Sequence, residues 1–254
     1  MSEENSKASS HCGKEWFRYW FGSPYYDMLY RNRNAAEAEN FISALTKELD
    51  LPRTASILDL ACGKGRHSLL LHSIGYQVTG VDLSEESIRF AQQYQSEGLN
   101  FLVGDMRSLN LNHRFDCVMN LFTSFGYFEQ IEDNLQVLQR VKEHLKPNGL
   151  FVLDYLNAGL IKSSLPQDYT VERENGVRFH IHKLLENDFV VKKIVIDNQE
   201  CQMNYEERVQ LLESEQLQNM LVRAGLSPIA LYGNYALQKF DPLKSERMII
   251  IASN

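Results

Sequence analysis

The sequence predicts an α/β fold with a doubly wound, mostly parallel sheet and a small inserted antiparallel sheet. Three observations lead to this class. Apolar runs alternate with helical patterns over residues 56–154, hairpin-like runs replace them over 169–209, and a helix and two strand-like runs then follow. Alternating strands and helices are typical of right-handed βαβ units, which place a parallel sheet between two helical layers.

Residues 35–154 are predicted to form several helices and five strands. Apolar residues recur at helical spacing over residues 35–49, and Pro52 ends the pattern. A later helix is expected to begin after Ser84 and another to end at residues 146–149. The predicted strands between these signals are 56–60, 76–82, 99–104, 115–120 and 150–154.

The second half adds a meander and then returns to the α/β pattern. Turn sequences such as Asn-Gly separate strand-like runs at 169–173, 177–184, 189–197 and 200–209. Ser214 is expected to cap a helix that Gly225 ends, before two final strands at 228–235 and 247–253. We therefore divide the chain into a flexible tail (1–14), an α/β domain (15–165 and 211–254) and an inserted antiparallel unit (166–210).

Composition excludes several classes of protein. The chain has 254 residues, of which 44% are hydrophobic and 23% charged, as in ordinary globular domains. A net charge of −7 offers no general attraction for a phosphate backbone, so nucleic acid is not expected as a partner. No apolar run approaches the ~20 residues that span a bilayer, and the four cysteines form no CxxC pair. These features predict a cytoplasmic protein with free thiols.

The most informative segment is the turn that contains Gly63 and Gly65. A predicted strand enters this Gly-x-Gly turn and a helix leaves it, so the backbone can approach a ligand closely. Asp82 ends the second strand, where a carboxylate can accept hydrogen bonds from two ribose hydroxyls. Asp105 follows the third strand, where it can meet the amino group of an adenine while Met106 packs on the ring. Together the three strand ends predict a nucleotide-type site.

Two kinds of alternative to a nucleotide-type site remain, one for single residues and one for the whole pattern. A bare Gly-x-Gly is also an ordinary strand-to-helix turn, and either aspartate alone could be a helix cap or a solvated loop charge. The pattern Gly63-x-Gly65-x-x-Ser68 followed by Asp82 also approaches the fingerprint of NAD(P)-dependent oxidoreductases. However, Ser68 replaces the third glycine, and the Gly-Asp pair at 104–105 has no place in that fingerprint.

The sequence resembles the class I S-adenosylmethionine-dependent methyltransferases from about residue 25 to residue 251. Four segments resemble the family's motifs in order, at 59–65, 81–84, 104–106 and 115–120. The segments 25–33 and 120–127 are similar to the branch with nucleotide-sugar N,N-dimethyltransferases and, more distantly, glycine N-methyltransferase. The resemblance implies a Rossmann-like sheet of seven strands with an antiparallel last strand, and inserted hairpins that form a lid over the acceptor.

The resemblance also implies a set of cofactor-binding residues. It assigns Asp82 to the ribose, Asp105 to the adenine amine and Arg33 to the methionine carboxylate of S-adenosylmethionine. The alternative for the N-terminal positions is an aromatic helix face that packs on the sheet beside a solvated arginine. The residues implied to bind S-adenosylmethionine and its product S-adenosylhomocysteine are Tyr26, Tyr30, Arg33, Asp59, Ala61, Gly63, Gly65, Asp82, Leu83, Gly104, Asp105, Met106, Asn120, Leu121 and Phe122.

The function that we predict is transfer of the sulfonium methyl group to a nitrogen or oxygen of a small-molecule acceptor by in-line displacement. The protein then has mainly to align the two reactants in a dry pocket. Tyr26, Ser124 and Tyr127 are the candidate catalytic side chains, as the polar groups expected nearest the methyl group. A non-catalytic cofactor-binding protein and an RNA or protein methyltransferase are the remaining alternatives, and a homodimer is one option for its assembly.

Two other groups are weaker candidates. His180 and His182 share one face of a predicted strand, but no third metal ligand lies near them in sequence, so no metal site is expected. Glu206, Glu207 and Arg208 could reach an acceptor from the last strand of the meander. A run of charges is more often a solvated face, and we interpret it in that way.

Overall fold

The computed structural model of this chain describes residues 10–11, 15–31, 35–198 and 202–254. Its larger sheet has the strand order β11-β12-β6-β5-β2-β3-β4, in which β12 runs antiparallel to both neighbours. This sheet confirms the predicted fold class. Its strands are β2 (Ser56–Leu60), β3 (Gln77–Asp82), β4 (Leu99–Val103), β5 (Phe115–Asn120), β6 (Leu145–Leu156), β11 (Ser227–Tyr232) and β12 (Arg247–Ser253).

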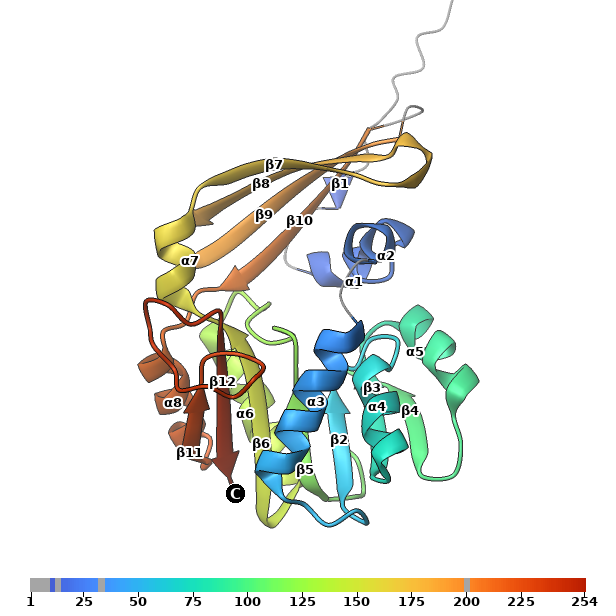
Figure 1. The fold of residues 1–254 in the computed structure, drawn as a ribbon, viewed down its shortest axis with the longest axis vertical. Helices are drawn as coiled ribbons and strands as arrows, with labels where there is room; N and C mark the ends of the chain where they lie inside the picture. Colours follow the sequence, from blue (N-terminus) through green and yellow to red (C-terminus); the bar gives the residue numbers. More distant parts are fainter. Residues whose placement is uncertain (1–9, 12–14, 32–34, 199–201) are drawn as a thin grey trace, which may run out of the picture.

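Helices cover both faces of this sheet (Figure 1). On one face, α3 (Ala35–Leu49), α4 (Arg66–Ile74) and α5 (Glu85–Ala91) bury apolar side chains against the strands, and the 3₁₀ helix η1 (Gln92–Tyr94) follows α5. On the other face, α6 (Ile131–His144) and α8 (Ser214–Arg223) do the same. The sheet is therefore buried on both sides, as its nearly continuous apolar strands require.

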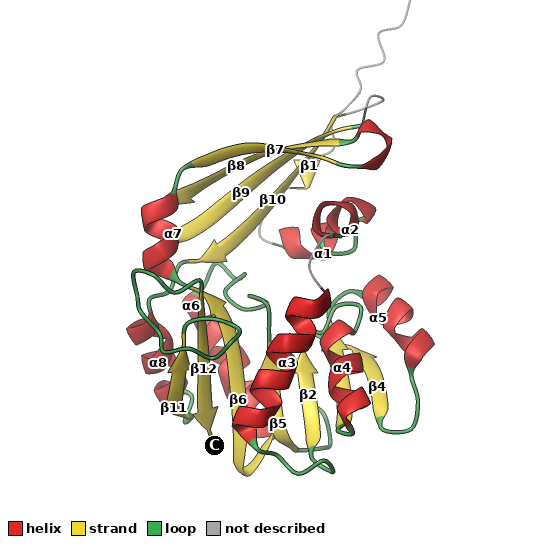
Figure 2. Cartoon of the chain, in the orientation of Figure 1, coloured by secondary structure: helices red, strands yellow, loops and turns green. Residues whose placement is uncertain are grey.

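A second sheet lies across the carboxyl ends of the parallel strands (Figures 1 and 2). The short strand β1 (Ser10–His11) joins one edge of this sheet, parallel to β10. Helices α1 (Trp16–Trp20) and α2 (Pro24–Tyr30) lie between the two sheets, and α7 (Ala158–Ser164) connects β6 to the second one. The antiparallel strands of the second sheet are β7 (Gln167–Glu172), β8 (Arg178–Glu186), β9 (Phe189–Asp197) and β10 (Gln202–Gln210). The 3₁₀ helix η2 (Glu174–Gly176) joins β7 to β8.

The inner face of the second sheet is built by strand alternation. Phe179 and Ile181 of β8 and Ile196 of β9 are buried and belong to the same apolar cluster as α1 and α2. The rings of Trp20 and Tyr205 lie 4.8 Å apart and join α1 to β10. Every second side chain of each strand thus faces the N-terminal helices and holds the second sheet against them.

Several boundaries differ from the sequence prediction. Helix α6 ends at His144 because Leu145 already pairs with Phe115 as the first residue of β6. Glu213 rather than Ser214 caps α8, through a reciprocal capping box with Gln216. Helices α1, α2 and α7 were not predicted, and β1 falls within the segment expected to be a flexible tail. Within the described part of the chain, no helix has the length and apolarity that a membrane crossing requires.

Candidate functional site

A cavity of about 1080 Å³ lies between the carboxyl ends of the parallel strands and the second sheet. The ends of β2, β3, β4 and β5 form its floor, α1 and α2 flank it, and strands of the second sheet cover it. The strand order reverses here, because β3 lies on one side of β2 and β5 on the other. Open α/β sheets bind their ligands at this topological switch point.

Most of the predicted site residues line this cavity. Gly65 and Asn120 lie beside it instead: Gly65 is the N-cap residue of α4, and Asn120 is buried with its Nδ2 donating to the carbonyl of Leu60 at 3.0 Å. Arg33 lies outside the described residues. The predicted residues on the cavity wall are Tyr26, Tyr30, Asp59, Ala61, Gly63, Asp82, Leu83, Gly104, Asp105, Met106, Leu121, Phe122, Ser124 and Tyr127.

The glycine turn leaves open space above the end of β2. Gly63 has a φ of +56°, and a β carbon added there would meet no protein atom within 4 Å. By contrast, a β carbon on Gly65 would lie 2.7 Å from the Phe101 ring, so that glycine serves the packing of α4 on the sheet. The two glycines therefore have different roles, and only Gly63 leaves room for a ligand.

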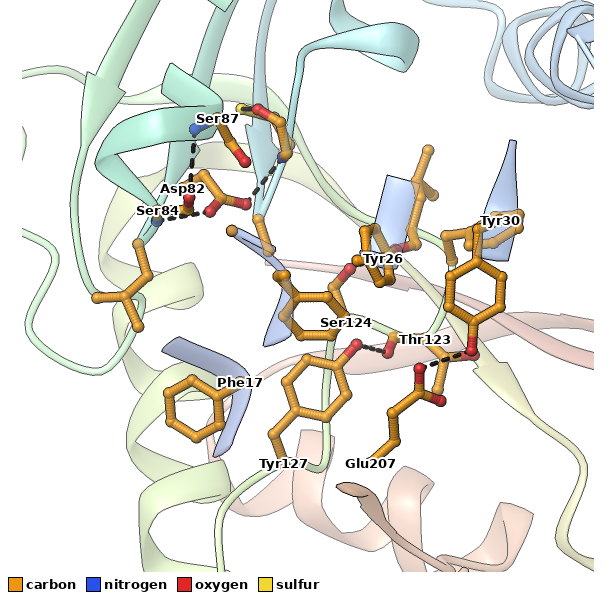
Figure 3. A pocket seen from close by; sticks show the side chains of 18 of the residues that line it. Phe17, Tyr26, Tyr30, Asp82, Ser84, Ser87, Thr123, Ser124, Tyr127 and Glu207 are labelled. Carbon is orange, nitrogen blue, oxygen red and sulfur yellow. Dashed lines mark hydrogen bonds between the residues drawn. The ribbon is translucent and has the colours of Figure 1, made fainter. Parts of the chain in front are cut away.

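Asp82 is held by backbone N–H groups at the end of β3. The N–H of Gly63 donates to one carboxylate oxygen and the N–H of Ser84 to the other, both at 2.8 Å (Figure 3). Burial raises the pKa of Asp82, and these N–H groups partly counteract the rise. A carboxylate has about four acceptor positions, so Asp82 keeps capacity for the two hydroxyls of a ribose.

Asp105 has an additional partner, Arg107, which the sequence prediction had not assigned. The guanidinium donates to Oδ1 at 3.0 Å and to Oδ2 at 2.6 Å. Burial alone would raise the pKa of Asp105, but hydrogen bonds and charge from Arg107, with the charge of Arg18, lower it overall. Asp105 is therefore ionised and fixed in direction. The backbone N–H of Arg107 also donates to Oδ1, at 2.9 Å, so about one of the four acceptor positions is left for an amino group.

Asp59 is almost fully buried under the turn. Its carboxylate accepts a hydrogen bond from Ser68 Oγ at 2.6 Å. Burial raises the pKa of Asp59 to about 6, with a further contribution from the charge of Asp82 and opposition from the Ser68 hydrogen bond. Asp59 is thus placed to brace the start of α4 from below the cavity.

The loop after β5 carries two of the candidate catalytic side chains. Phe122 and Thr123 both have positive φ angles, of +65° and +60°. Ser124 Oγ donates to the carbonyl of Leu121 at 2.9 Å, and the Tyr127 hydroxyl donates to the carbonyl of Thr123 (Figure 3). Because both hydroxyl protons are engaged, these oxygens are placed to accept hydrogen bonds from a ligand rather than to donate them.

An aromatic wall from α1 and α2 closes one side. The ring of Tyr26 lies 5.0 Å from that of Phe21 and 4.9 Å from that of Tyr30, and the Phe17 ring stacks on Tyr127 at 6.2 Å. These rings pack against one another, and Phe17, Phe21, Tyr26 and Tyr30 also line the cavity. Aromatic faces attract cations, and a sulfonium is one.

Sequence reasoning missed Lys183 and Lys192 of the second sheet, and it set Glu207 aside. Lys183, Lys192 and Glu207 line the cavity from above, and Tyr30 and Trp20 both donate to Glu207 Oε1 at 2.6 Å. The interpretation of Glu207 as part of a solvated face was wrong. Strand alternation contained the signal, because Glu207 shares a face of β10 with Tyr205, whereas its two neighbours pair with each other on the opposite face.

The two histidines of β8 lie on the outer face of the second sheet. His180 Nδ1 contacts Thr170 Oγ1 at 3.1 Å, and His182 pairs with Asp168. Among the residues that the structure describes, no group of three or more metal-ligating side chains occurs. The histidine pair therefore makes no contribution to the cavity.

Known proteins are similar to this chain in sequence and in fold. Residues 57–149 match the model of a methyltransferase domain family. The protein YqeM of Bacillus subtilis (strain 168) is 34% identical over 135 residues, which are 52% of this chain and 55% of that protein. The dTDP-3-amino-3,4,6-trideoxy-alpha-D-glucopyranose N,N-dimethyltransferase of Streptomyces venezuelae is 30% identical over 132 residues, 51% of this chain and 54% of that enzyme. The chain thus spans about half the length of the curated relatives that it matches.

A solved structure extends the similarity over most of the chain. The S-adenosylmethionine-dependent methyltransferase from Clostridium acetobutylicum ATCC 824 superimposes with a TM-score of 0.76 at 24% identity, over 90% of this chain and 96% of that one. This likeness shows a common fold. Together with the sequence matches, it confirms the resemblance that the motifs predicted.

Proposed function

We propose that this chain, in which residues 57–149 form a methyltransferase domain, moves the methyl group of S-adenosylmethionine to a nitrogen or oxygen of a small molecule. The observation that carries the proposal is the convergence of Gly63, Asp82 and Asp105 on one cavity at the switch point of the sheet. Amino-sugar methylation by a relative supports a small polar amine as the acceptor.

The residues present fit the cofactor. The space above Gly63, which a β carbon would occupy, suits the amino-acid portion, and Asp82 and Asp105 suit the ribose and the adenine amine. Leu83 and Met106 line the same part of the wall and would flank the base. S-adenosylmethionine, when bound, supplies a methyl group on a cationic sulfur. The leaving group is then a neutral thioether.

The work left to the chain is alignment and the exclusion of water. The second sheet and the aromatic wall cover the cavity, which favours a dry site in which reactants are held in line. Ser124 and Tyr127 would accept hydrogen bonds from an amine and so direct its lone pair. Gly63, Asp82 and Asp105 would hold the cofactor, which would supply the methyl group and keep the electron pair of the carbon–sulfur bond on its sulfur. Ser124 and Tyr127 would hold the acceptor nitrogen or oxygen, which would take the methyl group and release a proton to solvent.

The proposal is tested by calorimetry and by labelling. We expect the purified chain to bind S-adenosylmethionine and S-adenosylhomocysteine saturably, and to label one component of a fractionated metabolite extract with methyl-labelled S-adenosylmethionine. The proposal would be overturned if the chain bound neither S-adenosylmethionine nor S-adenosylhomocysteine. With the acceptor identified, Tyr127→Phe should lower kcat, and unchanged turnover would remove Tyr127 from the site.

A further inference from the structure

Three charged side chains form a row across the second sheet above the cavity. Lys183 of β8 lies directly opposite Lys192 of β9, and Lys192 lies directly opposite Glu207 of β10. All three line the cavity. The register therefore places two lysines and one glutamate side by side on the surface that faces the candidate methyl-transfer site.

This row interrupts an apolar surface. Phe179, Ile181 and Ile194 lie on the same inner face of β8 and β9 and are buried. Like charges directly opposite each other on neighbouring strands are destabilising, and burial of a charged group adds a desolvation cost. A lysine pair in this position therefore lowers the stability of the fold unless an anion compensates it.

The compensation inside the protein is incomplete. Glu207 Oε2 lies 3.7 Å from Lys192 Nζ, which also donates to the Tyr30 hydroxyl. For Lys183, the described residues supply neither a hydrogen bond nor an ion pair. Carboxylates do pair with other cations of the cavity wall, namely Arg18, Arg31, Lys64, Lys192 and Arg247.

The charges around Lys183 favour the binding of an anion. Burial lowers the pKa of Lys183, and the charge of Lys192 lowers it further, whereas Glu207 acts weakly in the opposite direction. Two lysines against one glutamate leave the row with a net positive charge. An oxyanion that bridged the two ammonium groups would remove both the repulsion and the unpaired charge.

We propose that Lys183, together with Lys192, binds an anionic group of the methyl acceptor, a phosphate or a carboxylate. The inference rests on the proposed function, because it treats the cavity as the acceptor's site. The anionic end would contact the second sheet, so that the nucleophilic end faces the glycine turn and the candidate catalytic hydroxyls. An acceptor of this class would be selected by charge despite the net charge of −7 of the whole chain.

The experiment titrates pyrophosphate and malonate into the full chain at low ionic strength, with and without saturating S-adenosylhomocysteine. We expect saturable binding of at least one probe, and the preferred probe distinguishes a phosphate from a carboxylate. Lys183→Gln should weaken that binding at least about tenfold, the effect of losing a charge-assisted hydrogen bond. Glu207→Gln should tighten it, because the competing negative charge is removed while an amide oxygen still accepts from Tyr30 and Trp20.

The matched control is Lys193→Gln. Lys193 neighbours Lys192 on β9, is 46% exposed on the outer face and pairs with Glu186, so its loss should leave anion binding unchanged. The proposal is overturned if the wild type binds neither probe, if Lys183→Gln binds as the wild type does, or if Lys193→Gln is weakened equally. A fourth variant, Lys64→Gln, should bind the probes normally, and an effect confined to it would place the anion at the cofactor loop and overturn the proposal.

The two proposals fail separately. Binding of S-adenosylhomocysteine by the wild type tests the cofactor site, and the anion titration without it tests the lysine pair. A chain that binds pyrophosphate through Lys183 but never binds S-adenosylhomocysteine would overturn the function and leave the anion site. Preserved S-adenosylhomocysteine binding by Lys183→Gln would show that the variant is folded.

Discussion

Arg247 and Asp154 form a buried ion pair beneath the loop that carries the candidate catalytic hydroxyls. The guanidinium contacts Asp154 Oδ1 through Nε at 2.8 Å and through Nη2 at 2.7 Å, and the aspartate side chain is 0% exposed. The other carboxylate oxygen accepts the N–H of Phe122 at 2.8 Å, and Arg247 also donates to Thr123 Oγ1 at 2.7 Å. The pair therefore holds two residues with positive φ, a conformation that costs roughly 1–3 kcal/mol per residue.

Asp154→Asn should destabilise the chain by about 3 kcal/mol, because it leaves the buried guanidinium of Arg247 without its counter-charge. Urea denaturation of wild type and variant measures the loss. The control is Glu143→Gln, which breaks an exposed ion pair with Arg140 and should cost under about 1 kcal/mol. Equal losses from both variants would show that the buried pair does not brace the loop.

Gly63→Ala and Gly65→Ala should separate ligand binding from folding. At Gly63 the added methyl meets no protein atom, so the free energy of unfolding should fall by only about 1 kcal/mol, the cost of the positive φ. The affinity for S-adenosylmethionine should nevertheless fall at least about tenfold. At Gly65 the methyl would collide with Phe101, so the free energy of unfolding itself should fall by more than 2 kcal/mol, on the order of other overpacking changes. Calorimetry measures the affinity for S-adenosylmethionine, and chemical denaturation measures the free energy of unfolding. Normal cofactor affinity in Gly63→Ala would contradict the assignment of this space.

Asp82→Asn should lower the affinity for S-adenosylmethionine about tenfold or more, since an amide offers one acceptor oxygen where the carboxylate offers two charged ones. The matched control is Asp116→Asn at the amino ends of the strands, where the carboxylate also accepts a backbone N–H, from Ser56 at 2.7 Å. That variant should change stability and leave cofactor affinity unchanged. A similar drop in affinity for both variants would mean that the effect is structural.

Asp59 should make stability depend on pH between about 4 and 6. Its pKa rises from an ordinary 3.8 to about 6 in the folded chain, so in this window the folded state keeps a proton that the unfolded state has released. Stability from this group is therefore greatest at low pH and falls by about 3 kcal/mol as pH rises through 6. Asp59→Asn removes the dependence, so its stability relative to wild type should increase from pH 4 to pH 7. A difference that stays flat over this range would contradict the raised pKa of Asp59.

The sequence by itself determined the parallel sheet and the floor of the site. Gly63, Asp82 and Asp105 could be placed together because each lies at or shortly after the end of a strand, and the carboxyl ends of parallel strands meet at one edge. The local pattern was sufficient there, since a strand, its turn and the next helix are contiguous in the chain. The roles of Gly65 and Asn120 could not be predicted, because Gly65 packs against Phe101 and Asn120 donates a hydrogen bond to the carbonyl of Leu60 on another strand.

Only the tertiary structure decided what covers the site. The row of Lys183, Lys192 and Glu207 depends on hairpin register, in which a shift of one residue would turn all three side chains to the outer face. The Arg247–Asp154 pair joins antiparallel strands more than ninety positions apart in the chain. Short helices such as α1 and α2 gain their stability from the surfaces that they bury. Their local sequence therefore does not predict them without the tertiary contacts.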